Sequence, residues 1–194
     1  MPTLIKAITV DSVPENQTYK HLEVHFRGND FGSVFTESKA FREPHEIISS
    51  AEDYLQKAYK GELKPGQSIE ADSDDSHYRV RFLPTNSVVD GVSVGSSAAG
   101  GRVVLQMEFD RVIGQDAVVS LEGRSPSREQ RTLGGRDEEV NIVEGNAPET
   151  KTMYIIGGSF GSTGKFGLYT LYPGTYAPPV NNRAYWEQHA FYRN

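Results

Sequence analysis

The stretch that decides the fold is KTMYIIGGSFGSTGKFGLYTLYPGTYAPP, residues 151–179. Two runs of alternating apolar and β-favouring residues, 153–156 and 166–172, flank a glycine-rich connection at 157–164. This pattern predicts an antiparallel β-hairpin. The second run ends at a Tyr-Pro-Gly sequence, 172–174, in which proline restricts φ and glycine tolerates positive φ. We therefore expect a tight turn directly after the second strand.

The end of the chain is unusually rich in aromatic residues. Four aromatic rings and an imidazole occur within eight residues, at Tyr185, Trp186, His189, Phe191 and Tyr192. So much apolar area favours a segment that docks on the rest of the chain over a frayed tail. Because Trp186 has the largest apolar side chain, we expect it to pack beneath the strand at 166–172 and so to fix the position of His189.

Outside this region, one segment predicts a helix and several predict strands. Residues 44–59 have apolar side chains at three- and four-residue spacing, with a proline at the first helical position. We expect this helix to cover a sheet with its apolar stripe. Alternating strand patterns occur at 4–10, 22–26, 77–83 and 102–109. Together these patterns predict an α+β fold made mainly of antiparallel sheet, with one principal helix at about 44–60.

The length of 194 residues predicts a single domain, 1–194. A division into an N-terminal subdomain, 1–120, and a C-terminal β-hairpin region, 121–194, stays open. The formal net charge is -6, so the molecule as a whole does not attract nucleic acid or an anionic membrane. The chain has no apolar run of membrane-spanning length and no classical signal peptide. We therefore expect a soluble, acidic protein that is cytoplasmic or exported without such a signal.

Two internal segments are poor in apolar anchors, which predicts that they are the most mobile. The first, 91–101, is rich in glycine and serine, and the second, 124–135, is locally basic. The one concentrated positive patch of the chain consists of Arg124, Arg128, Arg131 and Arg136. A patch of this kind is where an acidic protein could contact a polyanion.

Several other chemistries have little support in the sequence. The chain has no cysteine, which excludes disulfides and thiolate metal sites. The carboxylates at 72–75 lack the glycine and the distal glutamate of a calcium loop, and no two histidines have metal-binding spacing. We therefore expect neither a metal nor a cofactor.

The C-terminal third carries a series of short motifs. They are Leu168-Tyr169-Thr170, Tyr172-Pro173-Gly174, Ala177-Pro178-Pro179 and Trp186-Glu187-Gln188-His189-Ala190-Phe191. In this order they resemble bacterial proteins of unassigned function and, more loosely, the terminal sheet of the barnase/EndoU/colicin/RelE-like superfamily of RNase toxins. The chain departs from the first group at 140–144, where Val-Asn-Ile-Val-Glu replaces a stretch that tends to show Thr, Arg and Lys. If those basic residues are catalytic, this protein lacks the activity.

The resemblance implies an RNase in which a base helps the ribose 2′-hydroxyl to attack the adjacent phosphate. Histidine suits proton transfer near neutral pH, and arginine suits the negative charge that develops on phosphorus. We expect His189 to act as general acid/base, Arg136 as the phosphate contact and Thr170 as a hydroxyl on the neighbouring strand. The residues expected to contact the substrate are Arg131, Trp186 and Tyr172.

Two other functions stay open at this point. A non-enzymatic β-rich binding or structural module explains the absence of strong catalytic motifs equally well. An acidic protein that binds a basic partner would use the net charge of -6. The expected partner is therefore RNA or a protein, and the sequence does not decide between them.

Overall fold

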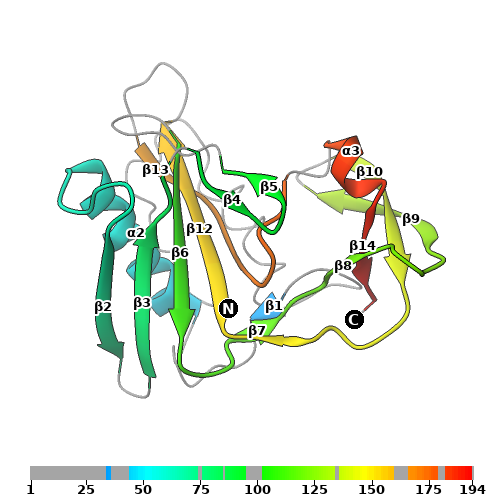
Figure 1. Ribbon diagram of the computed structural model, residues 1–194, viewed down its shortest axis with the longest axis horizontal. Helices are drawn as coiled ribbons and strands as arrows, with labels where there is room; N and C mark the ends of the chain where they lie inside the picture. The colour runs from blue at the N-terminus through cyan, green and yellow to red at the C-terminus, as the bar shows by residue number, and fades with distance from the viewer. Residues whose placement is uncertain are drawn as a thin grey trace.

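The computed structural model describes residues 34–35, 44–73, 76–84, 86–94, 102–133, 136–159, 166–178 and 182–193. They form a larger and a smaller sheet side by side, with helix α2 (Pro44–Tyr59) against the larger one (Figure 1). Nearly all strand pairs are antiparallel, so the predicted α+β class with one main helix is confirmed. The strands predicted at 4–10 and 22–26 lie outside the described residues.

The larger sheet has five antiparallel strands in the order β13-β12-β6-β3-β2. They are β2 (Ser68–Ser73), β3 (Ser76–Phe82), β6 (Val103–Phe109), β12 (Thr152–Ser159) and β13 (Phe166–Pro173). The predicted strands at 77–83 and 102–109 and the predicted hairpin are confirmed. The sheet takes strands from both sides of residue 120.

Glycines in the β12–β13 hairpin serve two different purposes. Strand β12 continues through Gly157 and Gly158, which the sequence placed in the connection. A Cβ atom at Gly157 would lie 2.7 Å from the carbonyl oxygen of Gly167 and 2.8 Å from a methyl carbon of Leu55. Glycine is therefore needed here because α2 and β13 approach β12 closely. Gly174, by contrast, has φ +98° and confirms the tight turn after β13.

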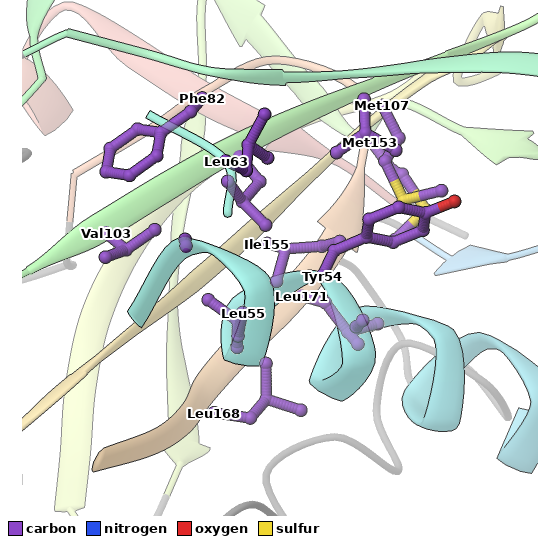
Figure 2. Close-up of a cluster of buried hydrophobic side chains, with 14 of the residues drawn as sticks. Tyr54, Leu55, Leu63, Phe82, Val103, Met107, Met153, Ile155, Leu168 and Leu171 are labelled. Atoms are coloured by element: carbon purple, nitrogen blue, oxygen red, sulfur yellow. The ribbon is translucent and has the colours of Figure 1, made fainter. Parts of the chain in front are cut away.

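Helix α2 covers one face of the larger sheet and makes the main core with it. Its buried residues Ala51, Tyr54, Leu55 and Ala58 form the predicted apolar stripe. Figure 2 shows Leu55 between the helix and the sheet residues, which include Ile155, Leu168 and Leu171. Burying one such leucine is worth about 2 kcal/mol, so this layer supplies much of the stability.

The opposite face of the larger sheet is partly covered by a small hairpin of β4 (Val88–Val89) and β5 (Val92–Ser93). Asp90 and Gly91 form its two-residue turn with φ +51° and +78°, the conformation that the Asp-Gly pair favours. The predicted mobile segment 91–101 thus begins inside a hairpin. Its remainder, 95–101, lies outside the described residues.

The smaller sheet has the order β8-β14-β10-β9. Its strands are β8 (Val118–Ser120), β9 (Ser127–Leu133), β10 (Arg136–Val143) and β14 (His189–Tyr192). Strands β10 and β14 are parallel neighbours, and the other pairs are antiparallel. A third sheet of short strands, β1 (Val34–Phe35), β7 (Gly114–Gln115) and β11 (Glu149–Thr150), completes the architecture together with helix α3 (Arg183–Trp186).

Strand β9 corrects the prediction of a mobile segment at 124–135. Residues 127–133 pair with β10 along their whole length, from Ser127 opposite Ile142 to Leu133 opposite Arg136. The segment has few apolar anchors, but its backbone groups are satisfied by the ladder with β10.

Within the described part of the chain, no helix is long and apolar enough to cross a membrane.

Candidate functional site

The aromatic C-terminal segment docks on the smaller sheet. Helix α3 begins after Asn182, whose side-chain oxygen accepts a hydrogen bond from the Tyr185 backbone N–H at 3.3 Å. Strand β14 then inserts between β8 and β10, with Phe191 opposite Ile142 of β10 and Val118 of β8. Docking of this segment was predicted and is confirmed.

Trp186 is buried, but its location differs from the prediction. Its ring stacks on Phe191 with centroids 4.5 Å apart, and its indole N–H donates to the Pro178 carbonyl at 3.2 Å. The buried residues around it, Ala117, Val140 and Ile142, belong to the smaller sheet and the segment before β8. The expected position beneath 166–172 is therefore wrong. The reason is that β14 completes a sheet of its own, and α3 covers that sheet.

Asn141 ties the segment to β10, and the sequence analysis did not single it out. Its side chain is only 8% exposed, and its Nδ2 donates to the carbonyls of Trp186 at 2.9 Å and of His189 at 3.3 Å. Both carbonyls flank the turn that leads into β14. The signal in the sequence was an amide inside the apolar run Val-Asn-Ile-Val, where a buried polar group needs partners.

His189 lies at the start of β14 and is half-buried. Its Nδ1 is 2.8 Å from the Tyr185 carbonyl oxygen, and its ring stacks on the Tyr185 ring with centroids 3.8 Å apart and planes 1° apart. A carbonyl can only accept, so Nδ1 carries the hydrogen and Nε2 is the basic atom of the neutral ring. Nε2 has no hydrogen-bond partner among the residues that the structure describes.

The two predicted arginines lie on the β9–β10 hairpin, away from His189. Because Ile142 pairs with Phe191, Val140 is the β10 residue level with His189. Arg136 is four residues before Val140, about 13 Å along the strand at the usual rise per residue. Arg131 is opposite Glu138 in register.

One arginine of the predicted basic patch, Arg128, has a carboxylate partner. The Nε of Arg128 lies 3.5 Å from a carboxylate oxygen of Glu139. Acidic residues occupy three consecutive positions of β10, 137–139, and face β9 residues in the ladder. Arg128 is therefore an arginine whose charge is matched by a neighbouring carboxylate.

Thr170 and Tyr172 lie together on β13, in the larger sheet, with Ile156 and Tyr154 as their partners on β12. The structure thus divides the predicted site residues between the two sheets. His189 and Trp186 are close neighbours through Tyr185, whose ring contacts both. The hydroxyl of Thr170 belongs to the other sheet.

Tyr172 is part of a tyrosine cluster on the face of the larger sheet opposite α2. We define this cluster as Tyr154, Tyr169, Tyr172 and Tyr176. The rings of Tyr154 and Tyr176 are 5.3 Å apart, and those of Tyr154 and Tyr172 are 6.3 Å apart. Burial raises the pKa of Tyr154 to about 12, although a hydrogen bond from Gln106 lowers it. The Tyr154 hydroxyl is therefore protonated at physiological pH.

Arg102, just before β6, adds a cation to this cluster. Its Nη2 is 3.5 Å from the Tyr176 hydroxyl, and its Nε is buried without a hydrogen-bond partner. Among the described residues, no carboxylate lies within ion-pair distance of the guanidinium. The sequence analysis placed this arginine only as the first residue of a strand, because a strand pattern does not show which charges lack partners.

Residues 174–178 join the two sheets. Tyr172 donates to and accepts from the backbone of Ala177, both at 3.3 Å, and Pro178 accepts the Trp186 indole hydrogen bond. Thr175 donates its hydroxyl hydrogen to Asp116 at 2.5 Å. The C-terminal segment is therefore anchored to the end of β13 by hydrogen bonds.

Two carboxylates hold this connection. Asp90 accepts the Tyr176 N–H at 3.0 Å, and Asp116 also accepts the Val118 N–H at 3.1 Å. Burial raises the pKa of Asp116; its hydrogen bonds lower the pKa, and the charge of Asp90 raises it further. Burial, followed by the charges of these two carboxylates, raises the pKa of Tyr185 to about 12. Asp90 and Asp116 therefore fix the backbone at Tyr176 and Val118 and the Thr175 side chain.

The described residues contain no group of three or more His, Cys, Asp or Glu side chains that could hold a metal ion. No protein-family model, curated protein or solved structure matches the chain. Functional arguments therefore rest on the residues and their geometry.

Proposed function

We propose that this protein binds RNA and cleaves it, with His189 as the general base. The observation that carries the proposal is the orientation of the His189 ring. Its Nδ1 donates to the Tyr185 carbonyl, which leaves Nε2 as a proton acceptor on a half-buried ring. The stack on Tyr185 restricts rotation of the ring, so Nε2 is held in one direction.

The chemistry needs one proton transfer at Nε2. In the first step, His189 takes the proton of a ribose 2′-hydroxyl, and the 2′-oxygen attacks the adjacent phosphorus. The bond from phosphorus to the 5′-oxygen breaks, the leaving 5′-oxygen takes up a proton from water, and the product is a 2′,3′-cyclic phosphate. His189 then returns its proton to the solvent. Arg136, Arg131 and Thr170 have no catalytic role in this proposal, because they lie on other strands than His189.

The test uses labelled single-stranded RNA and the same sequence with all 2′-hydroxyls methylated. The wild-type protein should cleave only the unmodified RNA. His189→Asn should slow cleavage by about 100-fold or more, the usual contribution of a general base, because Asn can donate to the Tyr185 carbonyl but cannot act as a base. His77→Ala is the matched control: His77 is half-exposed on the larger sheet and bonds Asp72.

Two results would overturn the proposal. The first is that the wild-type protein leaves both RNAs intact. The second is that His189→Asn cleaves as fast as His77→Ala. Thermal unfolding of each variant shows whether a lost activity follows from lost structure. If His189→Ala unfolds as readily as Trp186→Ala, the histidine is structural.

A second candidate is a non-enzymatic module that binds a basic partner. It is favoured by Asp90 and Asp116, which have no Lys or Arg within ion-pair distance among the described residues. Uncompensated carboxylates near one another attract a cationic side chain. Binding of an arginine-rich peptide, measured by calorimetry, should weaken in Asp90→Asn and not in Asp53→Asn, a matched change on the exposed side of α2. Equal affinities of the two variants would reject this candidate.

A further inference from the structure

The guanidinium of Arg102 is an incompletely satisfied cation in a half-buried position. A guanidinium has five N–H donors, and among the described residues its one side-chain hydrogen bond is a long one, 3.5 Å to the Tyr176 hydroxyl. The Nε is buried and has no acceptor. A charge that is removed from water in this way is costly unless an opposite charge compensates it. Within the described ranges, no carboxylate of the protein does so.

The tyrosine cluster lies beside this cation and contacts it through Tyr176. Burial raises the pKa of Tyr169 and of Tyr172, and the positive charge of Arg102 acts on both pKa values in the opposite direction. Tyr169 lies against β12 where Gly158 has no side chain; a Cβ there would be 2.8 Å from the Tyr169 hydroxyl. The glycine thus permits the position of the Tyr169 hydroxyl.

The other charged side chains on this face of the sheet form contacts of their own or lie further from Arg102 along the strands. Arg79 forms an ion pair with Glu108 at 2.7 Å, and both side chains are nearly half-exposed. Glu108 is four strand positions from Val104, the second residue of β6, so it is not placed to neutralise Arg102. Asp90 bonds the backbone of Tyr176 rather than the guanidinium.

We propose that Arg102, with the hydroxyl of Tyr176, binds a phosphate group. The guanidinium presents paired N–H donors that match two phosphate oxygens, and phenol hydroxyls are additional neutral donors. A tetrahedral oxyanion has several acceptor oxygens and would supply the negative charge that no carboxylate of the described residues supplies to this guanidinium. This site goes beyond the proposed function, because it lies on the larger sheet and requires no cleavage of RNA. The phosphate is either free inorganic phosphate or part of a nucleic-acid backbone.

The experiment measures binding to the full chain of two probes, inorganic phosphate by calorimetry and a short 2′-O-methylated RNA by fluorescence anisotropy. The methylated RNA cannot be cleaved through a 2′-hydroxyl, so failure of the catalytic proposal does not affect this measurement. Arg102→Gln should weaken binding by about 10- to 100-fold, the range expected for hydrogen bonds to a charged group. The matched control is Arg128→Gln, which removes the same charge from an arginine that is exposed and paired with Glu139.

The two probes distinguish the sources of the phosphate. Binding of both, weakened only in Arg102→Gln, supports a site for any phosphate, and binding of the RNA alone supports a backbone site. The proposal is overturned if the wild-type protein binds neither probe, or if Arg102→Gln and Arg128→Gln bind equally well. Tyr176→Phe removes one hydroxyl without a cavity and should weaken binding about 5- to 10-fold, so the test remains decisive if Arg102→Gln does not fold.

Discussion

Replacing Asn141 by alanine tests the account of how the C-terminal segment is held. The side chain is buried and donates two hydrogen bonds, to the Trp186 carbonyl at 2.9 Å and to the His189 carbonyl at 3.3 Å. A net contribution of about 1 kcal/mol per hydrogen bond, increased by the cost of leaving buried carbonyls unpaired, gives a loss of about 2–4 kcal/mol. We expect the free energy of unfolding of Asn141→Ala to fall by this amount.

The assay is urea denaturation followed by tryptophan fluorescence and by circular dichroism. Trp186 is the only tryptophan of the chain and lies within the segment, so its emission reports directly on the docking. Asn146→Ala is the control, because Asn146 is exposed and the same atoms are removed. That change should alter stability by less than about 0.5 kcal/mol, as is usual for surface positions.

A second variant sharpens the test. Asn141→Asp keeps the shape of the side chain but replaces the donor by a carboxylate that faces two carbonyl oxygens. It should be more destabilising than Asn141→Ala at pH 7, and less so in acid, where the protonated carboxyl can donate. The reasoning is refuted if Asn141→Ala is no more destabilising than Asn146→Ala, or if Asn141→Asp is as stable as the wild type at pH 7.

Three further predictions concern the two cores. Trp186→Ala should lower the free energy of unfolding by about 3–5 kcal/mol in chemical denaturation, because it removes the largest side chain of the smaller core; a loss below about 1 kcal/mol would contradict the burial. Gly157→Ala should lower the free energy of unfolding by about 1–3 kcal/mol through overpacking, since its Cβ would lie 2.7 Å from a backbone oxygen. An unchanged thermal midpoint would show instead that α2 can shift to make room. Burial, and then the charge of Asp53, raises the pKa of Glu52 to about 8. Because the pKa of Glu52 is higher in the folded than in the unfolded state, the free energy of unfolding is highest below about pH 4.5. It then falls as the pH rises through 8. Glu52→Gln should remove this pH-dependent loss of stability. The prediction is disproved if the free energy of unfolding depends on pH in the same way in the variant and the wild type.

The alternating patterns in the sequence predicted the larger sheet well, because they depend only on residues that are neighbours in the chain. A strand with one face on a core must alternate apolar and polar residues, so β3 and β6 can be read directly from the sequence. Helix α2 could also be predicted from the sequence, because its apolar residues repeat at helical spacing. Strand β9 was missed because its residues are mainly polar, and only pairing with β10 holds it in place.

The site could be predicted only in part. The cluster of aromatic residues around His189 correctly indicated docking, because apolar area next to a terminus must be buried somewhere. Which surface buries it is not a local property, and Trp186 packs with the smaller sheet instead of beneath β13. The roles of Asn141 and Arg102 follow from which groups lack partners after folding, and no spacing in the sequence carries that information.

The sequence by itself determined the fold class, the central helix and the β12–β13 hairpin with its Tyr-Pro-Gly turn. These features depend on residues that are near one another in the chain, and their periodicity and turn chemistry are sufficient. That Thr170 and His189 belong to different sheets, and that Arg102 lies beside Tyr176, 74 positions further along the chain, becomes visible only in the folded structure. Such contacts depend on strand order, which is set by the packing of whole sheets and not by any short stretch of residues.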